Sequence, residues 1–400
     1  MRFLQADLLF PILTEPIPHG ILVVEDDGRI NDIVHPLISE DNHRQLVGSP
    51  MLERFSGALT PGFINAHCHL ELSHLKGGIS GQKGLPDFLK SVTKYRQETD
   101  DRIVDAMKTA DDEMQQGGIV GVGDISNRLD SLPVKRQSQL RYHTFVEVFD
   151  LHPDMADVRF EQACQVEQAF RNHGLSTSIV PHAPYTVSEK LFRKISEHAL
   201  LHNGLLSIHN QETGSEDDFF MTGTGVLADF LKSTGRYDTW NPTGISSLRT
   251  CLSRLPAINR LLLVHNTFTD QLDYQWTVDH RPTTYWCLCP KANLYIENRL
   301  PDLTTLIQEE SNVLVGTDSL ASNDKLSLLD ELRVLASAAP WLTINRLLKM
   351  VTLDAARYFG WEQELGSFEM GKTPGVNLLA YQTIASSNCF SKDTKVTRIC

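Results

Sequence analysis

The chain has 400 residues, 41% of them hydrophobic and 22% charged, which is the composition of a globular protein large enough for one big domain with an appendage. Its formal net charge of −13 argues against nucleic acid as a partner, because an acidic chain repels a phosphate backbone. No apolar run approaches the ~18 residues that span a bilayer, which argues against a membrane partner.

The two ends of the chain predict a small β domain. Residues 1–57 hold short alternating runs between turn signals. They begin with a predicted strand in Met1–Leu8, where Gln5 and Asp7 interrupt any signal-peptide core. Residues 366–400 have the same character. Neither end can bury much apolar surface alone, so we expect 1–57 and 366–400 to pair into one small β-sandwich domain.

Between these ends, residues 58–365 alternate between strand and helix patterns. Eight apolar, β-rich runs each finish in polar residues: Ala58–His69, Gly118–Ser126, Arg141–Asp150, Ser176–Tyr185, Leu205–Glu212, Leu261–Thr267, Thr284–Asn293 and Asn312–Ser319. Helical spacing of apolar residues lies between them, in Asp101–Gln116, Val158–His173, Ser188–Asn203 and Leu326–Ala339. This alternation predicts an α/β fold in which 58–365 form a parallel (β/α)8 TIM-type barrel.

Cysteine usage predicts a reducing compartment. The chain has seven cysteines without the spacing of a disulfide framework, so we expect a cytoplasmic protein. Cys287 and Cys289 are a close pair in a strand-like run, and no second pair accompanies them as in a zinc knuckle. We therefore interpret both as buried strand residues.

The first barrel strand ends in His67-Cys68-His69, which is the strongest single signal in the sequence. Residues i and i+2 of a strand point to the same face, so His67 and His69 project together. Imidazole is the commonest metal ligand near neutral pH, and the pair predicts half of a metal site. The alternative is two partly buried histidines that only hydrogen-bond.

The other strand ends favour the metal site. Active sites of such barrels lie at the carboxyl ends of the strands, where the sequence places His182, His209 with Glu212, His265 and Asp318. We expect one divalent ion, Zn²⁺ with Fe²⁺ and Mn²⁺ as alternatives, held by His67, His69, His209 and Asp318. The run Ser178–His182 lacks the lysine that bridges two-metal sites on such barrels, which favours a single ion.

These residue types suit hydrolysis at an sp² carbon. A zinc ion can lower the pKa of water from ~15.7 to ~7, so metal-bound hydroxide is the expected nucleophile. We expect Glu212 to shuttle a proton to the substrate, His265 to stabilise the developing charge and Asp318 to accept the proton of the water. The alternative for Glu212 is a carboxylate that only stabilises a helix start.

Five motifs resemble the amidohydrolase superfamily, in the subgroup of cytosine-, guanine- and adenosine-type deaminases and their chlorohydrolase relatives. They are Pro61–His69, His209–Glu212, Val264–Asn266, Cys289–Asn293 and Gly316–Ser319. The resemblance covers essentially the whole chain, including Gly366–Lys372, which resembles the stretch where family members leave the barrel. It implies a metal-dependent hydrolase of carbon–nitrogen bonds with a small-molecule substrate and, at the family level, a homodimer.

Further stretches bear on the substrate. Pro181–Thr186 resembles deaminases of S-adenosylhomocysteine and methylthioadenosine, which implies that His182 contacts a purine nucleoside; the alternative is a histidine that only hydrogen-bonds behind the site. His69–Ser73 and Asp318–Asn323 are similar to the aminofutalosine deaminases. The expected substrate is therefore an adenine nucleoside derivative, such as aminodeoxyfutalosine or S-adenosylhomocysteine, whose 6-amino group is exchanged for an oxo group.

Two residues and one acidic segment each have two possible interpretations. Glu71 is either a ribose contact or a salt-bridged carboxylate, and Asn323 either lines the pocket for substrate binding or has a capping role. Glu216–Asp218 predicts a solvated loop, with a lid as the alternative.

Two other functions fit the same residues. A cyclic amide hydrolase, opening an imidazolone-type ring, would yield a new carboxylate without ammonia. A binding protein on this fold would hold metal without turnover. No catalytic position is visibly lost, so deamination is the favoured function.

Overall fold

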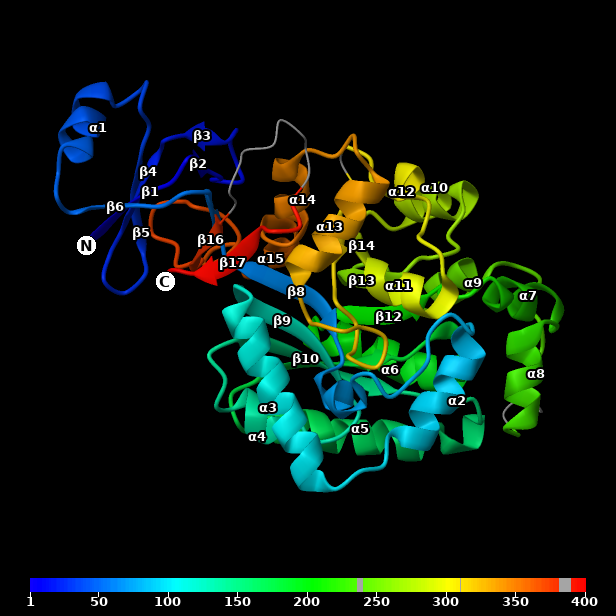
Figure 1. Cartoon of the computed structure of the whole chain (residues 1–400). Helices are drawn as coiled ribbons and strands as arrows, with labels where there is room; N and C mark the ends of the chain where they lie inside the picture. Colours follow the sequence, from blue (N-terminus) through cyan, green and yellow to red (C-terminus); the bar gives the residue numbers. More distant parts are fainter. Residues whose placement is uncertain (236–239, 310, 381–389) are drawn as a thin grey trace.

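The structure is a computed structural model that describes residues 1–235, 240–309, 311–380 and 390–400 (Figure 1). Residues 381–389, which belong to the predicted terminal β domain, lie outside the described residues. The fold is mixed α/β, as predicted, with two parallel sheets surrounded by helices and two further sheets at one side. No helix in the described part of the chain has the length and apolar character needed to cross a bilayer.

Two four-stranded parallel sheets contain the eight strands predicted for residues 58–365. The first has the order β11-β10-β9-β8 and the second β12-β13-β14-β15. Their bounds are β8 (Phe63–Cys68), β9 (Ile119–Ser126), β10 (Arg141–Val148), β11 (Ser176–Pro181), β12 (Leu206–Asn210), β13 (Leu261–His265), β14 (Thr284–Leu288) and β15 (Val313–Val315).

Hydrogen bonds connect the outer strands of the two sheets. The amide of His209, on β12, donates to the carbonyl oxygen of His182 after β11, at 2.9 Å. At the other junction, the amide of Thr317 donates to the carbonyl oxygen of His67 at 3.0 Å, and Cys68 forms an isolated parallel bridge with Asp318. The carboxyl ends of the two sheets are thereby brought to the same end of the molecule.

The four predicted helices are confirmed as α3 (Asp100–Gln116), α5 (Ala156–Arg171), α6 (Glu189–His202) and α13 (Leu328–Ala338). Their apolar sides pack on the strands in one large core, which includes Met107, Phe170 and Leu332. The other helices are α1 (Glu40–Val47), η1 (Leu70–Leu75), α2 (Leu85–Tyr95), α4 (Leu132–Lys135), η2 (Pro153–Met155), η3 (Pro184–Thr186), α7 (Ser215–Thr222), α8 (Val226–Ser233), α9 (Ser247–Arg254), α10 (Gln271–His280), α11 (Pro290–Glu297), α12 (Leu303–Leu306), α14 (Ile344–Met350) and α15 (Leu353–Phe359).

A second core fills the space between the strands. It contains Ala66 of β8, Phe145 of β10 and Val264 of β13, together with Tyr358 of α15. The Tyr358 hydroxyl donates to the carbonyl oxygen of Leu206, which begins β12, at 2.7 Å. Helix α15 therefore covers the amino ends of the strands, and the carboxyl ends face the site.

The remaining sheets bring the two ends of the chain together (Figure 1). One has the order β5-β4-β1-β6 and the other β17-β16-β7-β2-β3. Leu4 and Leu22 of the first sheet share a buried cluster with Leu9 and Leu59 of the second. The strands are β1 (Arg2–Gln5), β2 (Leu8–Leu9), β3 (Ile17–Pro18), β4 (Ile21–Val24), β5 (Ile30–Val34), β6 (Leu52–Arg54), β7 (Ala58–Pro61), β16 (Val376–Ala380) and β17 (Lys395–Arg398).

Several strand predictions were wrong in extent; Ser176–Tyr185, for example, ends as a strand at Pro181, and η3 begins at Pro184. The run Ala58–His69 is two strands, since β7 pairs antiparallel with β16 while β8 pairs with β9. Gly62 separates them at a place without room for a side chain, where a Cβ would lie 2.3 Å from Val120 and 2.7 Å from the carbonyl oxygen of Pro374. The run Thr284–Asn293 ends as a strand at Leu288.

Helix α11 replaces the second half of that run. Proline fits the first turn of a helix, where its missing N–H has no intrahelical partner to lose, and Pro290 begins α11. Cys287 is a buried strand residue as predicted. Cys289 is buried but precedes the helix as its N-cap.

Candidate functional site

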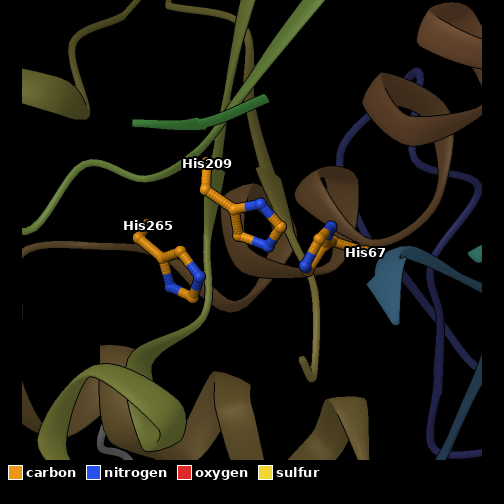
Figure 2. A group of neighbouring side chains, drawn as sticks. All are labelled: His67, His209 and His265. Carbon is orange, nitrogen blue, oxygen red and sulfur yellow. The ribbon is translucent and has the colours of Figure 1, made fainter. Parts of the chain in front are cut away.

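Three histidines converge at the carboxyl ends of β8 and β12. The Nε2 atom of His69 lies 3.1 Å from Nε2 of His67 and 3.2 Å from Nε2 of His209. Oδ1 of Asp318 lies 3.7 Å from Nε2 of His67 and 3.6 Å from Nε2 of His69. All four residues are buried. In Figure 2 the rings of His67 and His209 point toward one another, with His265 beside them.

The donors form two overlapping groups that could hold a metal ion, His67 with His69 and Asp318, and His67 with His209 and His265, and within each group the donor atoms lie within 4.8 Å of one another. A zinc–nitrogen distance of ~2.0–2.1 Å at a tetrahedral angle places neighbouring nitrogens about 3.3 Å apart, close to the separations seen. Nδ1 of His209 lies 2.8 Å from the carbonyl oxygen of His182, which can only accept, so Nδ1 carries the proton. Nε2 of His209 therefore presents a lone pair to the other imidazoles, as metal binding requires.

The electrostatics of the four donors also suit a cation. Burial, followed by the neighbouring histidines, lowers the pKa of His69 and of His209 well below the usual value, which keeps both rings neutral. Burial alone would raise the pKa of Asp318, but the nearby His67, His69 and His265 outweigh it and lower that pKa. The hydroxyl of Ser322 donates to Oδ2 of Asp318 at 2.5 Å and orients the carboxylate.

Glu212 and His265 face each other beside these donors. Nε2 of His265 lies 3.6 Å from Oε1 of Glu212. Burial, followed by the negative charges of Asp318 and Glu297, raises the pKa of Glu212 well above its usual value. A raised pKa favours the protonated carboxyl, which is the form that can donate a proton to a substrate.

Glu216 supports the backbone of Glu212. Its Oε1 accepts the amide of Gln211 at 3.1 Å and its Oε2 accepts the amide of Glu212 at 3.3 Å. The predicted solvated loop at Glu216–Asp218 was wrong, because these residues lie in the first turn of α7 and Glu216 is buried. The carboxylate is held inward by the backbone amides that follow β12 and by the hydroxyl of Ser247.

The candidate site opens into a cavity of about 700 Å³. Its floor includes His69, His209, Glu212, His265 and Asp318. Apolar side chains of α2 and α8 form part of the wall, namely Leu85, Phe88, Leu89, Phe230 and Leu231. A mainly apolar wall above a few convergent polar groups is typical of a small-molecule site.

Two of the three predicted substrate contacts lie in this cavity. His182 lines it, with Nδ1 2.9 Å from the Thr186 hydroxyl. Glu71 also lines it and pairs with Arg96, and burial raises the pKa of Glu71 to about 7.

Asn323 is not among the residues that line the cavity. Its Nδ2 donates to Oε1 of Glu331 at 2.7 Å and to the carbonyl oxygen of Thr317 at 3.0 Å, and its Oδ1 accepts the amide of Asp324 at 2.9 Å. These bonds hold the turn after Asp318, which agrees with the alternative of a capping role.

Three polar residues in or next to the site were not predicted from the sequence. Asp124, on β9, accepts the amide of Leu70, directly after His69, at 2.7 Å and forms a fully buried ion pair with Lys135. Asn127 follows β9, and Glu147 lies near the end of β10; both line the cavity. Their position at strand carboxyl ends is a signal that the sequence contains, because active sites of such folds lie there.

Comparison with known proteins gives consistent results. The sequence model of the "Amidohydrolase family" matches residues 58–398. The 5-methylthioadenosine/S-adenosylhomocysteine deaminase of Thermodesulfovibrio yellowstonii is 25% identical over 380 residues, which cover 91% of this chain and 81% of that protein.

Solved structures show the same fold. The aminofutalosine deaminase of Helicobacter pylori, in complex with methylthio-coformycin, superposes with a TM-score of 0.79 at 22% identity and covers 96% of this chain and 94% of that one. An adenosine deaminase from Xanthomonas campestris with bound zinc gives a TM-score of 0.75 at 22% identity and covers 96% and 85%.

Proposed function

The chain belongs to the amidohydrolase family, and from this premise we propose that it is a metal-dependent hydrolase that deaminates an adenine nucleoside derivative at its 6-amino group. One observation carries the proposal: Nε2 of His69 lies 3.1 Å from Nε2 of His67 and 3.2 Å from Nε2 of His209, the Asp318 carboxylate lies 3.6 Å away, and Glu212 lines the same cavity. The relatives named as deaminases of methylthioadenosine, S-adenosylhomocysteine and aminofutalosine support the substrate class.

We assign the metal to His67, His69, His209 and Asp318, and we propose zinc because a structural neighbour holds it. A zinc ion in this place would supply Lewis-acid activation of a water molecule, whose pKa falls from ~15.7 to ~7.

The protein's own groups would handle the protons and the substrate. Glu212 would donate its proton to the ring nitrogen next to the carbon that loses the amino group. His265, with Nε2 free to accept, would orient the attacking water, and Asp318 would take up its proton. His182 and Glu71 would contact the nucleoside from the cavity wall.

The finer architecture belongs to the same proposal. We propose that the two parallel sheets act as one closed (β/α)8 barrel over 58–365, supported by the hydrogen bonds at both junctions. The shared cluster of Leu4 and Leu59 supports a separate β-sandwich of 1–57 and 366–400. Free buried thiols such as Cys68 and Cys251 support a cytoplasmic location, and a homodimer stays a prediction.

Ammonia release tests the proposed function. The zinc-reconstituted protein would be assayed with aminodeoxyfutalosine, S-adenosylhomocysteine, methylthioadenosine and adenosine, and with guanine, cytosine and a triazine as contrasts. We expect ammonia from one or more of the adenine nucleosides and none from the contrasts. A new carboxylate without ammonia from an imidazolone would assign cyclic amide hydrolysis instead. Bound metal with no turnover on any substrate would identify a binding protein.

A further inference from the structure

The carboxylate of Glu147 takes no part in the proposed metal centre or proton transfer. Glu147 lies near the carboxyl end of β10, lines the cavity and is only 7% exposed. Its Oε2 accepts a hydrogen bond from Nδ2 of Asn127 at 3.0 Å. Its Oε1 is buried without a hydrogen-bond partner among the described residues. A buried acceptor left unpaired is costly, so the geometry calls for a donor that arrives with a ligand.

His209 does not supply that donor. Its Nδ1 lies 3.6 Å from Oε1 of Glu147, beyond hydrogen-bond distance. A neutral imidazole has one N–H, and that of His209 is already donated to the carbonyl oxygen of His182 at 2.8 Å. Glu147 is therefore not the carboxylate that orients this ring.

Asn127 fixes Glu147 beside a second acid, Glu71. The Asn127 amide donates to Oε2 of Glu71 at 3.1 Å, while its Nδ2 reaches both Oε2 and the carbonyl oxygen of Glu147. Arg96 donates to Oδ1 of Asn127 at 3.1 Å and pairs with Glu71. Asn127 thus links two carboxylates in one wall of the cavity, and Arg96 holds Glu71 from the other side.

A rigid pair of acceptors suits a group with two adjacent donors. The vicinal hydroxyls of a sugar present two O–H groups on one edge. We propose that Glu147, with Glu71 beside it, recognises the sugar hydroxyls of the substrate, so that the protein selects ribonucleosides over deoxynucleosides and free bases. This inference rests on the proposed function, because it assigns the sugar end of the same substrate.

Removing hydroxyls from the substrate tests the assignment. Zinc-loaded full-length protein would be assayed for ammonia release from adenosine, 2′-deoxyadenosine and 3′-deoxyadenosine. A hydrogen bond to a charged group corresponds to about 10- to 100-fold, so we expect the wild-type kcat/KM to fall by that factor when the hydroxyl facing Glu147 is absent. Glu147→Gln should lower kcat/KM for adenosine similarly, mainly through KM, and should discriminate between adenosine and that deoxynucleoside less than about threefold.

Equal losses on adenosine and both deoxynucleosides in Glu147→Gln would overturn the proposal, since a merely structural role acts on all three. Glu364→Gln is the matched control, because Glu364 is an exposed carboxylate that pairs with Arg141 at the opposite end of β10. It should keep the wild-type discrimination.

Binding of product nucleosides tests sugar recognition independently of the proposed deaminase activity. If the wild-type protein releases no ammonia from any nucleoside, the proposed function fails, and calorimetric titration with inosine and 2′- and 3′-deoxyinosine decides about Glu147. Tighter binding of inosine that is lost in Glu147→Gln would support the proposal. Equal binding, or no binding of the three, would overturn it.

The number of zinc ions bound per chain also tests the role of Glu147. Single donor atoms of Glu147, His182 and His209 lie within 4.8 Å of one another, which is also the arrangement of a metal site. Two zinc ions per chain, falling to one in Glu147→Gln, would assign Oε1 to a second ion and overturn the role in sugar recognition.

Discussion

Asn293 fixes the position of the proton on His265. Its Oδ1 lies 2.9 Å from Nδ1 of His265, and its Nδ2 donates to the carbonyl oxygen of the same residue at 3.3 Å. Because Oδ1 can only accept, the ring proton sits on Nδ1, and Nε2 faces Glu212 with a lone pair.

Asn293→Ala should therefore impair catalysis while the metal is retained. Loss of a group that orients an active-site histidine costs about 10- to 100-fold in related settings, and we expect kcat to fall by that factor. Steady-state rates and zinc content of the purified variant are the measurements. Asn172→Ala, at an exposed position after α5, is the control. Zinc lost in parallel with activity would contradict an effect confined to His265.

Glu212→Gln should keep the metal and lose most turnover. The amide cannot deliver a proton, and general acid–base groups contribute about 10²- to 10⁴-fold. Zinc content should equal that of the wild type because Glu212 is not among the four converging donors. Activity within tenfold of the wild type would rule out proton delivery by Glu212.

His67→Ala should lose zinc. The substitution removes one of the imidazole nitrogens of the proposed metal centre. We expect the zinc content after dialysis to fall to a small fraction of the wild-type content, with turnover falling in proportion. Elemental analysis and ammonia release are the two readouts. A fully active, zinc-loaded His67→Ala protein would contradict the assignment of the metal centre.

The buried ion pair of Lys135 and Asp124 should be a major stability determinant. Nζ of Lys135 lies 2.6 Å from Oδ2 of Asp124, and both side chains are fully buried. Lys135→Met leaves an unpaired buried carboxylate and should lower the free energy of unfolding by about 3–5 kcal/mol. Urea unfolding at a fixed zinc concentration measures it.

Two variants make the Lys135 result specific. Adding Asp124→Asn to Lys135→Met should recover part of the lost stability, since it removes the unpaired charge. Lys108→Met, in the exposed pair of Lys108 with Asp105, should change stability by less than about 0.5 kcal/mol. Equal effects of the buried and the exposed substitution would contradict the argument.

The contribution of Glu216 to stability should fall as the pH rises from about 5 to about 8. Burial raises the pKa of Glu216 from 4.5 to about 8, so between these values the folded protein holds a proton that the unfolded chain releases. The contribution of Glu216 is therefore fully present below pH 4.5 and is lost as the pH rises through about 8. Urea midpoints across this range should depend less on pH in Glu216→Gln than in the wild type. Identical slopes would contradict the assignment.

Periodicity and strand ends made much of the fold and the centre of the site predictable. The spacing of His67 and His69 places both on one face of a strand, and the structure brings them to His209 and Asp318. These residues can be recognised from the sequence because the carboxyl end of a strand is visible in the local pattern of apolar and polar residues. The role of each remains a prediction.

What the sequence did not predict depends on contacts between distant segments. Glu147 becomes notable only because Asn127, from another strand, occupies one of its oxygens and leaves the other unpaired. Asn323 turns away from the cavity because Glu331, on α13, takes its amide. The break at Gly62 follows from the approach of Val120 and Pro374, which no local pattern records.

The break between β7 and β8 at Gly62 also affects local unfolding of the protein. A single residue separates β7, which is hydrogen-bonded into the terminal sheet, from β8, which ends next to the metal ligands. Fraying of the terminal sheet would release the anchored end of β8 and so loosen His67 and His69 without touching the cavity. The amides of β7 and β8 should therefore exchange with solvent as one cooperative unit, and a ligand in the cavity should slow exchange in the distant terminal sheet.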